Sequence, residues 1–133
     1  MKEIIAILEK NPIVYIATVD GDQPRVRPFQ FQLEQDGKLW FVTANNKDVY
    51  AQLKKNPKIE FSTCLPDMTT LRVRGSVTLD DSMTIKQWVM DNRPMIKGIY
   101  GSADNPIFAV FCLEHGQAVI FDFSGQPPRE FSF

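Results

Sequence analysis

Hydrophobic positions along the chain follow two patterns, one typical of strands and one typical of helices. Most hydrophobic stretches are β-branched or aromatic residues bounded by Gly, Pro, Asn or Asp, which is typical of strands. They predict strands at residues 13–19, 25–34, 38–43, 58–65, 69–79, 107–113 and 117–123. Turn-like residues at 20–21, 35–37 and 114–116 predict hairpins, so we expect the first three strands to form an antiparallel meander.

Helical spacing occurs between these strands. Residues 2–10 carry Ile and Leu on one face and stop at an Asn-Pro pair, and residues 46–55 repeat that pattern with Asn45 or Asn46 as the expected cap. A third helix begins at the Asp-Asp-Ser of residues 80–82 and is broken by Pro94. A short helical segment at 95–100 follows it.

These elements predict a mainly β fold. Six to seven antiparallel strands with isolated helices between them are typical of a closed or nearly closed β-barrel with peripheral helices. Gly75, inside a cleanly alternating strand, indicates a bulge or bend. No strand–helix–strand alternation with glycine-rich turns occurs, which argues against a doubly wound nucleotide-binding fold. The length of 133 residues predicts one domain over 1–133, with an extended tail at 124–133.

Composition narrows the class of protein further. The formal net charge is −1, so no global charge favours nucleic acid or an anionic membrane, and any anion site must be a local cluster of Lys and Arg. No apolar run reaches the length of a membrane span, and no export signal is visible, so we expect a soluble cytoplasmic protein. Cys64 and Cys112 lie far apart and outside metal or redox spacing, as structural thiols do.

The sequence shows no motif for catalysis by the protein's own side chains. The single histidine, His115, falls in a predicted turn, and no nucleophile motif accompanies it. No spacing of His, Cys, Asp or Glu indicates a metal site, and phosphate-binding glycine motifs are absent. We therefore name no catalytic residue and expect any reactive group to come from a cofactor.

Lys47 is the first unusual position. It lies in the first turn of a predicted helix, where the helix dipole disfavours a cation by up to about 1 kcal/mol. A cation there becomes favourable when an anion occupies the helix N-terminus, and Thr43, Asn45 and Asn46 add hydrogen-bonding groups beside it. The pattern fits a phosphate site, and it also fits an exposed lysine beside an asparagine cap.

Arginines form a second local cluster, with Arg25 and Arg27 on one predicted strand and Arg72 and Arg74 on another. Pro28 follows Arg27 in mid-strand, and proline removes a donor from the ladder. The Arg-Pro pair therefore indicates an edge strand or a bulge, where backbone groups stay free to meet a ligand.

At these positions the sequence resembles the pyridoxamine 5'-phosphate oxidase-like family of FMN-binding split barrels. The resemblance covers nearly the whole chain, and the order and spacing of its motifs are more specific than any single one. The motif at residues 93–100 resembles the small nitroimidazole-reductase-related branch of the family. The matching stretches are residues 23–29 (QPRVRPF), 39–43 (LWFVT), 45–47 (NNK), 53–57 (LKKNP), 71–75 (LRVRG) and 93–100 (RPMIKGIY).

The resemblance implies a six- to seven-stranded antiparallel FMN-binding split barrel and a homodimer with the flavin at the subunit interface. Asn46 and Lys47 would hold the flavin phosphate, while Val42 and Thr43 would contact the ring and ribityl chain. Thr70 matches a polar flavin contact more weakly. The remaining implied contacts, along the flavin ring and phosphate, are Arg27, Pro28, Phe29 and Gln30.

Two family signatures are absent. The tail lacks the arginine–histidine pair of the vitamin oxidases, and His115 is in the wrong segment to match the flavin-proximal histidine of the nitroimidazole-reductase branch. We therefore expect an FMN-dependent oxidoreductase that uses a small-molecule electron donor and acceptor and is not a vitamin oxidase. Two alternatives stay open: a flavin-binding storage or stress protein without turnover, and a split barrel for another ligand such as a deazaflavin or haem.

Overall fold

The computed structural model describes residues 1–133 as four helices and eight strands in one antiparallel sheet. None of the helices has the length and apolar character needed to cross a bilayer. The helices are α1 (Lys2–Lys10), α2 (Asp48–Lys55), α3 (Met83–Asn92) and α4 (Pro94–Tyr100). The strands are β1 (Ile13–Asp20), β2 (Gln23–Gln30), β3 (Leu33–Gln35), β4 (Lys38–Ala44), β5 (Lys58–Cys64), β6 (Thr70–Thr78), β7 (Phe108–Phe121) and β8 (Arg129–Ser132).

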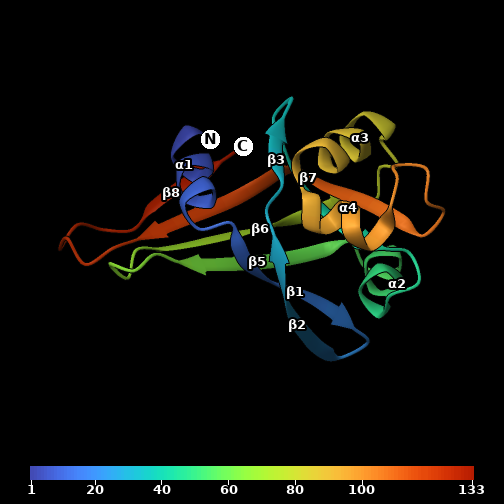
Figure 1. Ribbon diagram of the computed structural model, residues 1–133. Helices are drawn as coiled ribbons and strands as arrows, with labels where there is room; N and C mark the ends of the chain where they lie inside the picture. Colours follow the sequence, from blue (N-terminus) through green and yellow to red (C-terminus); the bar gives the residue numbers. More distant parts are fainter.

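The sheet closes through one short piece of chain. Its strand order is β2-β1-β5-β6-β7-β4-β3, so β2 and β3, which follow each other in sequence, occupy opposite ends of the order. Phe31 N–H donates to Pro12 O on the β1 side at 2.7 Å, and Gln32 N–H donates to Trp40 O on β4 at 3.0 Å. The chain thus joins both ends of the sheet, as the predicted barrel requires (Figure 1).

The predicted meander of the first three strands is wrong in its second half. Residues 25–34 divide after Gln30, where the chain leaves β1 and crosses to β4, so only the three residues of β3 form the hairpin with β4. The β1–β2 hairpin is confirmed, with eight paired positions from Ile13↔Gln30 to Asp20↔Gln23.

The hairpin predicted at Glu114-His115-Gly116 is also wrong, because residues 108–121 form the single strand β7. Glu114 and His115 are exposed on it. Gly116 pairs with Gly75, and a Cβ on Gly116 would lie 2.8 Å from the ring of Phe133. Close packing therefore explains this glycine, and the bulge expected at Gly75 occurs as a register shift between Gly75 and Val77.

Aromatic rings fill the barrel. Phe41 is fully buried and stacks on Phe111, with ring centroids 5.5 Å apart. Phe29, Phe31 and Phe61 contact the ring of Phe41 edge-on at 5.7 to 6.5 Å. These contacts join strands from both halves of the sheet into one core.

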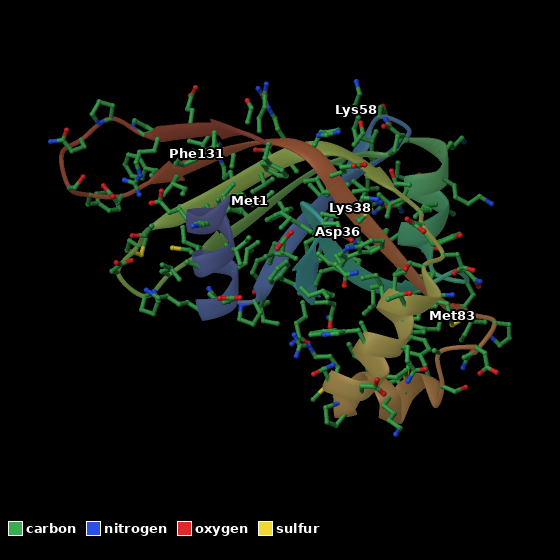
Figure 2. All side chains as sticks on the ribbon, turned by 90° about the horizontal axis from the view of Figure 1, so that it is seen from above. Met1, Asp36, Lys38, Lys58, Met83 and Phe131 are labelled. Atoms are coloured by element: carbon green, nitrogen blue, oxygen red, sulfur yellow. The ribbon has the colours of Figure 1, made fainter.

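The helices α3 and α4 pack on the outside of the barrel, where β7 separates two hydrophobic clusters. Phe111 and Leu113 of β7 point into the barrel, whereas Val110 and Cys112 point to α3 and α4. Ser82 caps α3, since its Oγ accepts from Ile85 N–H at 3.3 Å. The predicted break at Pro94 is confirmed, because α4 begins there. Viewed from above, α3 and α4 occupy one corner of the molecule, away from α1 (Figure 2).

Candidate functional site

Strand β2 is an edge strand, as the Arg27-Pro28 pair predicts. It pairs only with β1, and Pro28 lies opposite Tyr15 in an unbroken register. Because Pro28 lacks an N–H, it fits where the nitrogen points away from β1, and Val26 shares that orientation as an alternate residue. The backbone N–H and C=O of Val26 are therefore free on the open side of the sheet.

The side chain of Arg27 points to the face of β2 opposite that of Val26 and Pro28, and it is half-buried against Gln52 of α2. Its guanidinium donates to Thr18 Oγ1 and to Gln52 Oε1, each at 2.7 Å, and makes no ion pair with a carboxylate. Burial lowers the pKa of Arg27, and the neighbouring charge of Arg25 lowers the same pKa further. A half-buried cation that hydrogen-bonds only to neutral groups and lies near a second cation would be stabilised by an anion.

The N-terminus of α2 is open. Lys47 is the N-cap residue, and its side chain makes no capping hydrogen bond. The predicted asparagine cap is wrong, because Asn45 donates to Pro106 O at 2.8 Å and Asn46 is exposed in the turn. The N–H groups of Asp48 and Val49 consequently have no protein acceptor. Such free N–H groups at a helix start attract anions.

A basic hollow of about 750 Å³ lies between this helix and the β1–β2 hairpin. Asp20 is neutralised by Arg25, with Nε to Oδ2 at 3.3 Å, and Asp48 is the other acid in the wall. Cations therefore outnumber acids in the wall. Its lining residues are Asp20, Arg25, Arg27, Lys47, Asp48, Val49, Ala51, Gln52 and Lys55.

A second hollow, of about 260 Å³, adjoins the first and is more apolar. Arg27, Lys47 and Val49 line both, so they mark the junction. In Figure 1, α2, α4 and the β1–β2 hairpin gather at this same end of the barrel. The second hollow is lined by Arg27, Pro28, Phe29, Gln30, Gln32, Val42, Thr43, Lys47, Val49, Ile96, Ile99 and Tyr100.

Thr43 contributes an unsatisfied polar atom to the second hollow. Its side chain is 2% exposed, and its Oγ1 has no hydrogen-bond partner. A buried hydroxyl without a partner costs about 1–3 kcal/mol, and a bound ligand that accepts or donates a hydrogen bond here would remove this cost. Tyr100, across the hollow, stacks on Phe108 at 4.8 Å, and burial raises the pKa of its phenol. Tyr100 is therefore protonated at neutral pH.

The structure brings seven of the nine residues implied by the family resemblance to the second hollow. Asn46 is outside both linings, although it neighbours Lys47. Thr70 is also outside them: it opens β6, and its hydroxyl contacts Cys64 Sγ at 3.8 Å and Met68 O at 3.3 Å. The seven are Arg27, Pro28, Phe29, Gln30, Val42, Thr43 and Lys47.

Other lining residues were not predicted from the sequence. Gln52 lies on the predicted helix, and its amide oxygen accepts a hydrogen bond from Arg27, a contact between helix and strand that no local spacing indicates. Gln32 alternates with Gln30 in an otherwise apolar stretch, which is a weak signal. Ile96, Ile99 and Tyr100 reach the hollow only because α4 folds back over β4, and no local pattern shows that.

Comparison with known proteins gives a consistent result. The sequence model of the pyridoxamine 5'-phosphate oxidase family matches residues 1–116. A NimC/NimA family protein from Clostridium acetobutylicum is 37% identical, with a TM-score of 0.91 over 100% of this chain and 92% of that one. No curated protein matches the sequence.

More distant structures share the fold. General stress protein 26 from Bacillus anthracis is 16% identical, with a TM-score of 0.81 over 99% of this chain and 98% of that one. A pyridoxamine 5'-phosphate oxidase-related, FMN-binding protein from Nostoc punctiforme is 18% identical. Its TM-score is 0.70, over 98% of this chain and 88% of that one.

Proposed function

The chain belongs to the pyridoxamine 5'-phosphate oxidase family, and from this premise we propose that it is a flavoprotein that binds FMN across the two adjoining hollows. The observation that carries the proposal is the pair Arg27 and Lys47, which line both hollows and have no carboxylate partner. The FMN-binding relative from Nostoc punctiforme has the same fold and supports this choice of cofactor.

The basic hollow suits the phosphate of FMN. Arg27 offers a planar fork of donors, Lys47 offers an ammonium group, and the free N–H groups of Asp48 and Val49 complete the set. Charge-assisted hydrogen bonds of this kind are the strong ones. Phosphate bound here would also supply the negative charge that Arg27 lacks within the protein.

The apolar hollow suits the flavin ring system. Pro28 and Phe29 of β2, Val42 of β4 and Ile96 of α4 would exclude water from the ring, and Thr43 Oγ1 would gain the hydrogen-bond partner it lacks. When bound, FMN supplies the electron-transfer chemistry. The chain itself contributes binding, orientation and exclusion of water, and Tyr100, whose pKa is raised by burial, stays protonated in the wall of the apolar hollow.

The functional unit in this proposal is a homodimer. Both hollows are open on one side, so one chain alone does not enclose a ligand. The outer face of β1 and β2 carries exposed hydrophobic side chains, with Tyr15 56% and Val26 68% exposed. Ala17 pairs with Val26 and Tyr15 with Pro28, which makes the patch continuous across both strands. A second copy covering this patch would close the flavin site at the interface.

Flavin titration of the purified protein tests the cofactor. We expect FMN to bind and give a yellow protein, and riboflavin to bind about ten- to a hundredfold more weakly because it lacks the phosphate. A colourless protein that ignores FMN at high micromolar concentration would rule the proposal out. Equal affinity for both ligands would rule out the phosphate site.

Anaerobic mixing with NADH or NADPH tests for turnover. Bleaching of the bound flavin, followed by its reoxidation with a quinone or nitroaromatic compound, is expected of an oxidoreductase. Bound FMN that neither nucleotide reduces would instead favour the flavin-storage alternative.

A further inference from the structure

Gln32 and Arg93 form a contact between the barrel and the α3–α4 corner. Arg93 Nε donates to Gln32 Oε1 at 3.1 Å, and Arg93 Nη2 donates to the backbone O of Gln32 at 2.7 Å. The Gln32 amide nitrogen in turn donates to Gln30 O at 3.0 Å. Residue 93 joins α3 to α4, and α3 lies beside β3 in Figure 1.

These contacts fix the orientation of the Gln32 amide. A guanidinium can only donate, so the Gln32 atom that it contacts must be the amide oxygen. A backbone carbonyl can only accept, so the atom facing Gln30 O must be the amide nitrogen. Both partners require the same orientation, and neither leaves a flipped amide as an alternative.

One hydrogen of the Gln32 amide remains unused. The NH₂ group has two hydrogens, and the only acceptor that the structure gives it is Gln30 O. Gln32 is 3% exposed and lines the apolar hollow together with Gln30 and residues of α4. A buried, oriented donor next to a ligand hollow is placed to serve the ligand.

We propose that Arg93 is a positioning residue that holds Gln32 so that its free amide N–H donates a hydrogen bond to the flavin ring. This inference rests on the proposed FMN site. Reduction increases the electron density on the ring, so a fixed donor stabilises reduced FMN more than oxidised FMN. The Arg93–Gln32 pair therefore raises the midpoint potential of the bound flavin.

Arg93 is suited to this role because it is itself immobilised. Its guanidinium stacks on the indole of Trp88, 5.0 Å from the ring centroid, and its planar fork meets two oxygens of one residue. Lysine would keep the charge but would lose the fork and the stacking. The contact also ties the start of α4, which lines the hollow, to the link between β2 and β3 that carries Gln32.

The test compares Gln32→Glu and Gln32→Met with the wild type. The glutamate keeps an acceptor for Arg93 but has no N–H, and the methionine has similar length and neither group. The control is Gln117→Glu, because Gln117 Oε1 also accepts from an arginine, with Arg74 Nη2 at 2.6 Å, away from both hollows. The readouts are the midpoint potential and the dissociation constants of oxidised and reduced FMN.

We expect both Gln32 variants to lower the midpoint potential. Affinity for reduced FMN should fall about tenfold more than affinity for oxidised FMN, which corresponds to about 30 mV for a two-electron couple. Gln117→Glu should leave the potential unchanged. An equal loss of affinity for both redox forms, or no change at all, would show that the pair is only structural.

Arg93→Lys covers the case in which the Gln32 variants do not fold. It leaves the buried glutamine in place, and we expect the potential to shift in the same direction. An unchanged potential in this variant overturns the inference. Failure of the wild type to bind FMN would instead overturn the proposed function, so the two failures are distinguishable.

Discussion

Arg27 and Lys47 both line the basic and the apolar hollow, and neither is paired with a carboxylate. Arg27 is positioned by strand pairing and by its contacts with Thr18 and Gln52, whereas Lys47 is positioned by the start of α2. Strand β2 and the N-terminus of α2 thus each place a positive charge at the junction of the two hollows.

Lys47→Ala should weaken FMN binding about ten- to a hundredfold, because it removes a charge-assisted contact to the phosphate. Riboflavin binding should change little. Fluorescence quenching of the flavin measures both. Lys54→Ala is the matched control, since Lys54 lies on the same helix over the ring of Tyr50 and lines neither hollow. Equal losses in the two variants would refute the assignment of Lys47.

Thr43→Val separates a ligand contact from a structural one. The hydroxyl of Thr43 has no partner in the protein, so its removal should leave the stability of the unliganded chain unchanged or raise it by about 1 kcal/mol. FMN affinity should fall by about threefold to tenfold, the value of one neutral hydrogen bond. Thermal unfolding with and without FMN measures both effects. A clear destabilisation of the unliganded chain would argue against this interpretation.

Val26→Glu tests the dimer. A carboxylate in the centre of the exposed β1–β2 patch should dissociate the two copies and, with them, weaken FMN binding. Light scattering after size-exclusion chromatography measures the mass. Met83→Glu, an exposed position at the start of α3, should remain dimeric. A wild-type monomer that binds FMN tightly would disprove the shared site.

The two cysteines should differ in reactivity. Burial raises the pKa of the Cys112 thiol to about 11, while Cys64 is exposed. An alkylating reagent at pH 8 should modify Cys64 in the native protein and both thiols in denaturant. Peptide mass spectrometry identifies the sites. Rapid native labelling of Cys112 would contradict its burial.

The same shift predicts a pH dependence. Between an ordinary thiol pKa near 9 and the folded value near 11, the unfolded chain loses the Cys112 proton and the folded chain keeps it. Stability should therefore fall as the pH rises through this window. Cys112→Ala should show a smaller fall than the wild type in denaturant titrations at pH 8 and pH 10.5. An equal loss of stability in Cys112→Ala and the wild type would contradict the raised pKa of Cys112.

Most elements of this fold could be predicted from local pattern, because strand alternation and helix stops are local. The exceptions involve distant partners. Gly116 looks like a turn residue, but a side chain there would be too close to the ring of Phe133, just after β8, and to the carbonyl of Arg74 on β6. The break after Gln30 depends on closure of the barrel, and no residue between 30 and 33 indicates it in the sequence.

The same distinction holds for the candidate site: residues with a local sequence signal were predicted, and residues that depend on distant partners were not. Lys47 could be identified from the helix dipole, and the Arg27-Pro28 pair from the ladder rule for proline. The asparagine cap failed because Asn45 bonds to Pro106, a residue far along the chain. The role of Gln32 depends on Arg93, which the fold brings to it from the α3–α4 corner.

Strand β7 gives both hydrophobic clusters a common wall, with Phe111 on one side and Val110 on the other. Loss of packing in either cluster would expose one face of β7, and we expect it to destabilise the other cluster. Amide protons on both sides of β7 should exchange with the same free energy of opening, as one cooperative unit. Substitutions in α4, which contributes Ile96 to the outer cluster, are therefore expected to lower the stability of the whole chain.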